Sequence, residues 1–243
     1  LETAITDTCT NLDRQFLEYC RTHSSYCGTT AVGALITELG RRLTVFNIGD
    51  SEAFLYRAGE VIELTSKHSP NHDDERARIL AAHGWITEEK ELYFGRLHRM
   101  DLEDQYILQR AEALDFTCIY RVCGEIAVSR SIGDIPYKGY TPGKVVNEPF
   151  VWPHDHNQIF SADLVIPNPD FVALNLTDQD EFMILASDGL WDVVSSQDAC
   201  IRFRQLLDQG ESPEKIAEEL SDLAIRLGSS DNVTIVIVQF LHD

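Results

Sequence analysis

Apolar residues recur at intervals of three and four positions at the start of the chain. Ile5, Cys9 and Phe16 lie on one such stripe, which predicts an amphipathic helix over residues 1–23. Over residues 28–64 the pattern changes to short runs of apolar and β-branched residues, separated by turns that contain glycine. These runs predict short antiparallel strands joined by tight turns.

The last third of the chain has equally clear patterns. The apolar run FMILA at 182–186 predicts a central strand that is buried on both faces. One helix is expected to begin near Ser195 or Ser196. Another should begin at Ser212, where the hydroxyl can cap it and a proline follows, and should end at Gly228. A closing strand is expected over 233–240.

These elements predict an α+β fold in one domain, residues 1–243. Hairpin-length links between strands, with helices in runs, favour antiparallel sheets covered by helices over a doubly wound parallel sheet. Helical spacing also occurs over residues 73–83. The stretch 87–122 is charged and has little regular period, so we expect a flap or insertion there.

Composition excludes several classes of protein. The formal net charge of −20 argues against binding to nucleic acid, which relies on clustered Lys and Arg. No apolar run is long enough for a membrane helix, and the first residues do not resemble a signal peptide. The six cysteines form no CxxC pair and indicate reduced thiols, so we expect a cytoplasmic or nuclear protein.

Three aspartates share one local context at the ends of predicted strands. Asp50 follows the strand LTVFNI, Asp188 follows FMILA, and Asp231 precedes VTIVIVQF. Carboxylates gathered in one crevice repel each other unless a cation lies between them, and Mg²⁺ or Mn²⁺ prefers such oxygen ligands. An aspartate beside a glycine is also a common turn residue, so context alone leaves both interpretations open.

Two other kinds of site are disfavoured by residue spacing. Cys123 and Arg130 are the nearest approach to a cysteine phosphatase motif, but six residues separate them and no histidine precedes the cysteine. The histidines lack the cysteine pairs that accompany them in many zinc sites, so loop or surface roles are favoured for them.

Several phrases of the chain, in order, resemble the metal-dependent protein phosphatase family (type 2C, PPM). They are GTTAVGALI, FNIGDSEAFLYR with LTSKHSP and the following ERARI, then GEIAVSRSIGD, DEFMILASDGLWD and GSSDNVTIVIV. The resemblance implies two antiparallel sheets packed face to face, with helices outside and metal ions in a cleft at one end. It also implies hydrolysis of phosphoserine and phosphothreonine on proteins, with direct attack by a metal-bound hydroxide.

The resemblance assigns roles to particular residues. Asp188 and Asp231 would bind two catalytic Mg²⁺ or Mn²⁺ ions, and Asp50 and Asp192, with Asp188, would hold a weaker third ion. Three residues would support the site without binding a metal directly: Asp134, Gly189 and Asn232. Phosphorylated proteins would be the partners, and we expect a monomer.

The chain also departs from the family pattern. The family's D-G-H-G-G motif, which supplies a bridging aspartate and the general acid, is not in these residues. Because the chain starts at Leu1 rather than Met, we expect an excerpt whose parent supplies that motif. The alternatives are a pseudophosphatase acting as a protein-binding scaffold and a hydrolase of small phosphoesters. Lys67 stands where the family is usually acidic, and we expect this to affect surface detail rather than chemistry.

Overall fold

Two antiparallel β-sheets form the centre of the structure, a computed structural model that describes residues 1–37, 41–91, 97, 99–112 and 117–241. The four-stranded sheet has the order β11 (Ile235–Gln239), β10 (Asp180–Ala186), β4 (Glu52–Arg57) and β5 (Glu60–Glu63). The three-stranded sheet has the order β2 (Ala31–Thr37), β3 (Arg42–Ile48) and β9 (Asp170–Asn175). All strand pairs within both sheets are antiparallel, as the sequence predicts.

Alternating side chains of these strands fill the space between the two sheets. Leu43 and Val45 of β3 meet Leu55 of β4 and Met183 of β10 in one buried apolar cluster. Successive side chains of a strand point to opposite faces, so the residues between them face outward from the sandwich. Burial of this inner layer fixes the strand register, because a slip by one residue would turn the apolar set away from the core.

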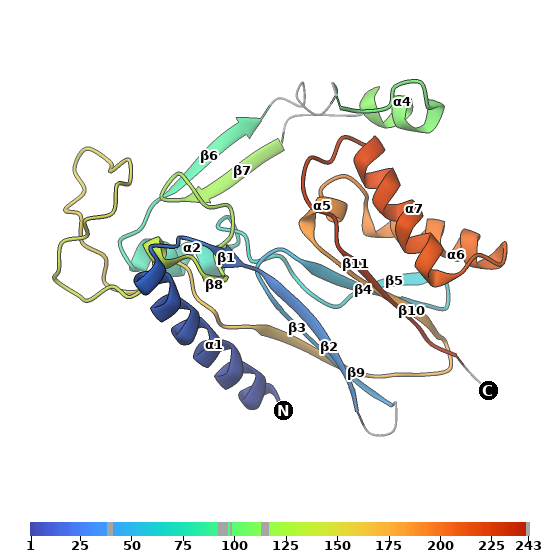
Figure 1. Ribbon diagram of the computed structural model, residues 1–243, viewed down its shortest axis with the longest axis horizontal. Helices are drawn as coiled ribbons and strands as arrows, with labels where there is room; N and C mark the ends of the chain where they lie inside the picture. The colour runs from blue at the N-terminus through green and yellow to red at the C-terminus, as the bar shows by residue number, and fades with distance from the viewer. Residues whose placement is uncertain (38–40, 92–96, 98, 113–116, 242–243) are drawn as a thin grey trace.

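Helices α6 (Ser196–Asp208) and α7 (Pro213–Arg226) cover the outer face of the four-stranded sheet (Figure 1). Phe182 of β10 is fully buried there, and its ring lies 4.8 Å from that of Tyr56 and 4.1 Å from that of Phe203, measured between centroids. These rings pack with the apolar side chains of both helices in one large cluster. The sheet therefore has apolar residues on both faces, as its continuous run FMILA predicts.

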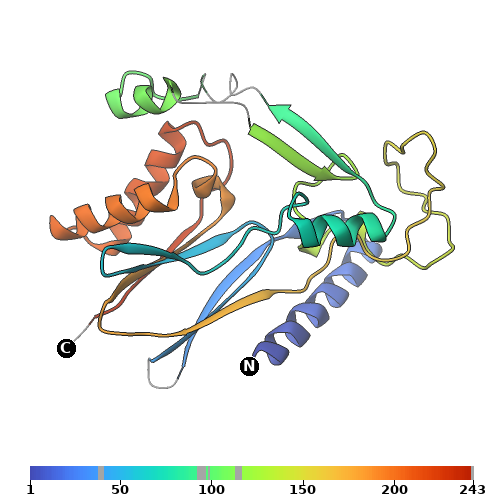
Figure 2. The same ribbon diagram turned by 180° about the vertical axis from the view of Figure 1, so that it is seen from behind.

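Helix α1 (Glu2–His23) lies on the opposite side of the molecule, beside the three-stranded sheet (Figures 1 and 2). Its Cys9 packs with Ile48 of β3 and with Ile132. A buried ion pair adds to the contact, since Lys138 Nζ lies 2.6 Å from Asp13 Oδ1. Helices on both sides of two packed sheets confirm the α+β sandwich that the sequence predicts.

The predicted helix boundaries agree closely with the structure. The Ser195 hydroxyl accepts from the Asp198 N–H at 3.1 Å, and the Ser212 hydroxyl accepts from the Lys215 N–H at 3.3 Å. Both serines therefore satisfy a first-turn N–H that has no partner within the helix. The spacing at 73–83 corresponds to α2 (Asp73–Ala81).

The stretch 87–122 contains regular elements that its sequence pattern does not reveal. Strands β6 (Ile86–Glu91) and β7 (Thr117–Val122) pair as a hairpin, and α4 (Gln105–Glu112) lies between them in sequence. Helix α4 lies over the α6–α7 layer (Figures 1 and 2), where Ile107 is fully buried in its apolar cluster. Ion pairs join Arg110 to Asp198 and Arg226 to Asp104. Residues 92–96, 98 and 113–116 of the predicted flap lie outside the described residues.

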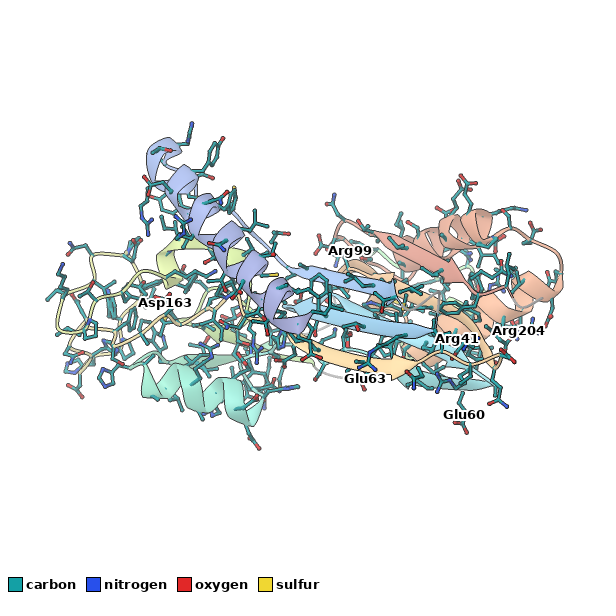
Figure 3. The ribbon with its side chains drawn as sticks, turned by 90° about the horizontal axis from the view of Figure 1, so that it is seen from below. Arg41, Glu60, Glu63, Arg99, Asp163 and Arg204 are labelled. Atoms are coloured by element: carbon teal, nitrogen blue, oxygen red, sulfur yellow. The ribbon has the colours of Figure 1, made fainter. Side chains whose placement is uncertain are left out.

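A second core lies between α2 and the connections around the short elements β1 (Gly28–Thr29), β8 (Ile132–Gly133) and η1 (Ile135–Tyr137). Phe150 and Phe160 are buried there against Trp85. Asp163 fixes one of these connections by accepting from the Gly139 N–H at 2.7 Å. Figure 3 shows Asp163 at the opposite end of the molecule from Arg204 of α6.

A buried ionic network ties α2 to strand β9 of the three-stranded sheet. Arg130 Nη2 lies 2.6 Å from Glu75 Oε1, and Arg130 Nη1 lies 2.7 Å from Asp170 Oδ1 at the start of β9. Arg78 binds the other oxygen of Glu75 at 2.7 Å. Burial alone would raise the pKa of Glu75, but hydrogen bonds from Arg130 and Arg78 outweigh burial and lower this pKa to about 2.

Glu75→Gln should flatten the acid side of the stability profile. The folded-state pKa of Glu75 is about 2, against an ordinary value of 4.5. The carboxylate therefore stabilises the fold above about pH 4.5 and loses this contribution as the pH falls toward 2. Between pH 5.5 and 3.5 the wild type should lose about 1 kcal/mol more than the variant, measured by urea unfolding.

The matched control is Glu18→Gln, because that side chain on α1 is 71% exposed. The control should keep the pH dependence of the wild type. Equal slopes for wild type and Glu75→Gln would contradict the buried ionic network.

Candidate metal centre

Strand register brings the candidate aspartates to one edge of the four-stranded sheet. β10 ends at Ala186, and this residue pairs with the first residue of β4 on one side and of β11 on the other. Asp188 follows the end of β10, while Asp50 precedes β4 and Asp231 precedes β11. Because neighbouring strands run in opposite directions, these three connections lie at the same edge.

The turn that carries Asp50 is held by His68. Gly49 has a φ of +95°, which glycine adopts at little cost, and its N–H donates to His68 Nδ1 at 2.9 Å. The backbone N–H of His68 donates in turn to the Gly49 carbonyl at 3.0 Å. His68 Nε2 lies 3.1 Å from Asp170 Oδ2 and donates to it, because Nδ1 is the acceptor of the neutral ring. Burial lowers the pKa of His68 and favours this neutral form.

Asp188 opens the short helix α5 (Asp188–Trp191), and close backbone packing holds it beside the loop of Asp231. A Cβ atom at Gly189 would lie 2.4 Å from the Asn232 carbonyl oxygen, so no other residue fits there without a shift. The Ser229 hydroxyl donates to the Gly189 carbonyl at 2.8 Å. Gly189 and Asn232 thus support the candidate ligands by positioning two loops through backbone contacts.

Electrostatic coupling shows that the carboxylates at this edge are crowded. Burial, and after it the charge of Asp188, raise the pKa of Asp50 to about 6. The pKa of Asp188 is also raised, first by burial and then by the charges of Asp192 and Asp231. Asp188 therefore lies close enough to Asp50, Asp192 and Asp231 for their charges to interact, and this mutual repulsion is unfavourable.

Lys67 and Glu52 belong to the same group of charges. The Lys67 ammonium lies 3.2 Å from Asp192 Oδ1 and 3.4 Å from Glu52 Oε1. Burial outweighs the opposing charge of Lys67 and raises the pKa of Glu52 to about 7. The expectation that Lys67 affects only surface detail is therefore too narrow, because its ammonium binds the side chain of a candidate ligand.

Asp134 occupies a different place in the structure. Its carboxylate accepts from the Ser131 hydroxyl, and the charges of Lys138 and Asp13 act on it. It also lies against the backbone of Gly28, where an added Cβ would be 2.0 Å from Asp134 Oδ2. These contacts support a structural role near α1 and β8, rather than binding of an ion at the edge that carries Asp188.

The aspartates offer the type of ligand that a hard divalent ion prefers, but they do not form a complete ligand set. Mg²⁺ and Mn²⁺ prefer carboxylate oxygens in octahedral geometry. Within the described part of the chain, no group of three His, Cys, Asp or Glu side chains is arranged to hold a metal on its own. Asp188 and Asp231 therefore fit as part of a metal site that needs further ligands.

Burial and side-chain contacts account for residues of the two other sites that the sequence disfavours, the cysteine phosphatase site and the zinc site. Cys123 is buried, and burial raises the pKa of its thiol to about 12, which disfavours the thiolate that a nucleophile needs. Arg130 is bound by Glu75 and Asp170. His156 packs against the ring of Trp85.

The sequence of the chain also matches the model of a known protein family. The family model described as "Protein phosphatase 2C" matches residues 1–233. The chain belongs to the protein phosphatase 2C family. Among the described residues, no helix is both long and apolar enough to cross a membrane.

Two plant proteins illustrate the similarity of this phosphatase 2C chain to its relatives. "Probable protein phosphatase 2C 69" of Arabidopsis thaliana is 32% identical over 99% of this chain and 52% of its own length. "Probable protein phosphatase 2C 43" of the same plant is 34% identical over 89% of this chain and 40% of its own length. The chain thus spans about half the length of these curated relatives.

Solved structures share the fold. A crystal structure of serine-threonine phosphatase 2C from Toxoplasma gondii superposes with a TM-score of 0.64. It is 22% identical and covers 99% of this chain and 67% of its own. A C. elegans sex determining protein has a TM-score of 0.65 at 21% identity, over 98% of this chain and 46% of its own.

His68→Ala should destabilise the fold by about 2–4 kcal/mol, because it leaves a cavity and removes the acceptor of the buried Gly49 N–H. The free energy of unfolding in urea measures this loss. His72→Ala is the matched control, since His72 is exposed and its side chain makes no cap hydrogen bond. That change should stay within about 0.5 kcal/mol. Equal stabilities of the two variants would show that His68 does not hold the turn.

Proposed function

We propose that the protein containing this chain hydrolyses phosphoserine and phosphothreonine on other proteins. The proposal is supported by membership of the phosphatase 2C family and by the relatives named as protein phosphatases. The observation that carries it is the crowded edge where Asp188, Asp231, Asp50 and Asp192 meet around the end of β10. Crowded carboxylates at a rigid strand end are a suitable base for divalent cations.

Asp188 and Asp231 are the proposed ligands of Mg²⁺ or Mn²⁺ from this chain. When bound, the ions supply positive charge to the phosphoryl oxygens and acidify the attacking water. The chain's own task is to hold the two carboxylates in place, through the Gly189–Asn232 contact and the short helix α5. Rigid carboxylates keep the ions positioned, and positioning with electrostatics is most of what phosphoryl transfer requires of a protein.

The bridging aspartate and the general acid are proposed to come from outside these residues. The D-G-H-G-G motif expected of the family does not occur in the 243 residues of the chain. A parent protein without that motif would instead be a pseudophosphatase with a scaffold role. The monomeric state and the cytoplasmic or nuclear location stay predictions.

Asp188→Asn in the full-length protein should reduce hydrolysis of a phosphothreonine peptide at least about 100-fold, since it removes a carboxylate that positions charge. Initial rates of phosphate release in Mn²⁺ measure this effect, and circular dichroism checks that the fold is retained. Asp155→Asn is the control, because the Asp155 side chain is 98% exposed in a distant loop. Unchanged turnover in Asp188→Asn would overturn the assignment.

Mn²⁺ should raise the melting temperature of the full-length protein, because an ion that binds only the folded state stabilises it. At about 100 times its dissociation constant, one ion contributes about 2.7 kcal/mol. The shift should disappear in the double variant Asp188→Asn/Asp231→Asn, and differential scanning calorimetry measures both proteins. An equal shift in the double variant would place the ions elsewhere.

A further inference from the structure

The Lys67 ammonium lies where two acidic elements of the candidate site meet. Glu52 is the first residue of β4, and Asp192 follows the last residue of α5. Lys67 Nζ is 3.4 Å from the carboxylate of the first and 3.2 Å from that of the second. One cation therefore joins the two elements that flank the end of β10.

The charge of Lys67 acts on the same carboxylates that would attract an ion. It opposes the raised pKa values of Asp50, Glu52 and Asp188. A divalent ion bound by Asp192 would lie about 2 Å from its carboxylate oxygen. That position adjoins the ammonium, and two cations so close together repel each other strongly.

We propose that Lys67 is a built-in cation that takes the place of a third divalent ion between Asp50 and Asp192. The Asp188–Asp231 side of the acidic edge stays available for ions, because the direct contacts of the ammonium are with Glu52 and Asp192. Lys67 thus neutralises the Glu52–Asp192 part of the acidic edge, and the Asp188–Asp231 part requires metal ions. This inference rests on the proposed metal-dependent function, since both concern the same group of carboxylates.

A plain surface ion pair is the competing explanation, because Lys67 is 33% exposed and Asp192 is 64% exposed. Exposed pairs of this kind have little effect on their surroundings. The contact with Glu52 argues for more, since the Glu52 side chain is only 10% exposed. A nearby cation favours the charged form of a buried carboxylate, and Lys67 acts on Glu52 in this direction although burial keeps its pKa at about 7.

The number of Mn²⁺ ions bound per chain tests the proposal without reference to catalysis. Isothermal titration of the full-length protein should show one more Mn²⁺ bound by Lys67→Asp than by the wild type. The gain should vanish in Lys67→Asp/Asp192→Asn. Lys215→Asp makes the same change of charge at an exposed lysine of α7 that pairs with Glu211, and it should bind as many ions as the wild type. Equal counts for Lys67→Asp and wild type, or an equal gain in Lys215→Asp, would overturn the proposal.

Lys67→Met provides a second measurement that adds no new ligand. In EDTA this variant should melt below the wild type, because Glu52 and Asp192 lose their shared cation. Mn²⁺ should then raise its melting temperature by several degrees more than it raises that of the wild type. Equal Mn²⁺ shifts in the two proteins would count against a displaced ion. A wild type that binds no Mn²⁺ would sink the proposed function, whereas an unchanged count in Lys67→Asp would sink this inference alone.

Discussion

The pairing of β10 with a strand on each side is the constraint on which the rest of the site depends. Ala186 is held between the first residues of β4 and β11, so three connections that are distant in sequence must leave the sheet together. Each connection carries an aspartate, and their mutual repulsion opposes the pairing that gathers them. The apolar layers on both faces of β10 supply the burial that holds the strands together despite this cost.

Local sequence patterns predict much of this architecture. Ser195 and Ser212 mark the starts of two helices because a hydroxyl cap satisfies the first turn by itself, without help from the rest of the chain. The run FMILA marks β10 because only a strand covered on both faces is apolar at every position. Asp188 and Asp231 adjoin strands that the pattern identifies, but that context also fits turn residues, and only the resemblance to the family makes them candidate ligands.

What the sequence did not reveal depends on contacts between distant residues. Helix α4 is fixed by the burial of Ile107 and by the pairing of Arg110 with α6, and neither leaves a signal in the local period. The role of Lys67 has the same explanation, because its partners are the first residue of β4 and the residue that follows α5. The signal that could have found it was present, namely one basic residue at a position that is usually acidic in the family. The contacts of Lys67 with Glu52 and Asp192 became apparent only in the folded structure.

Trp191 closes α5 at the centre of this arrangement, and its position has a practical consequence. The indole N–H lies 2.9 Å from the Ala186 carbonyl oxygen and 3.3 Å from that of Glu52, so the ring bridges the two strands beside the acidic edge. Trp85 and Trp152 lie together in the other core, with ring centroids 5.2 Å apart. Trp191 is therefore a native fluorophore beside the acidic edge, and its emission offers a direct optical signal of changes there.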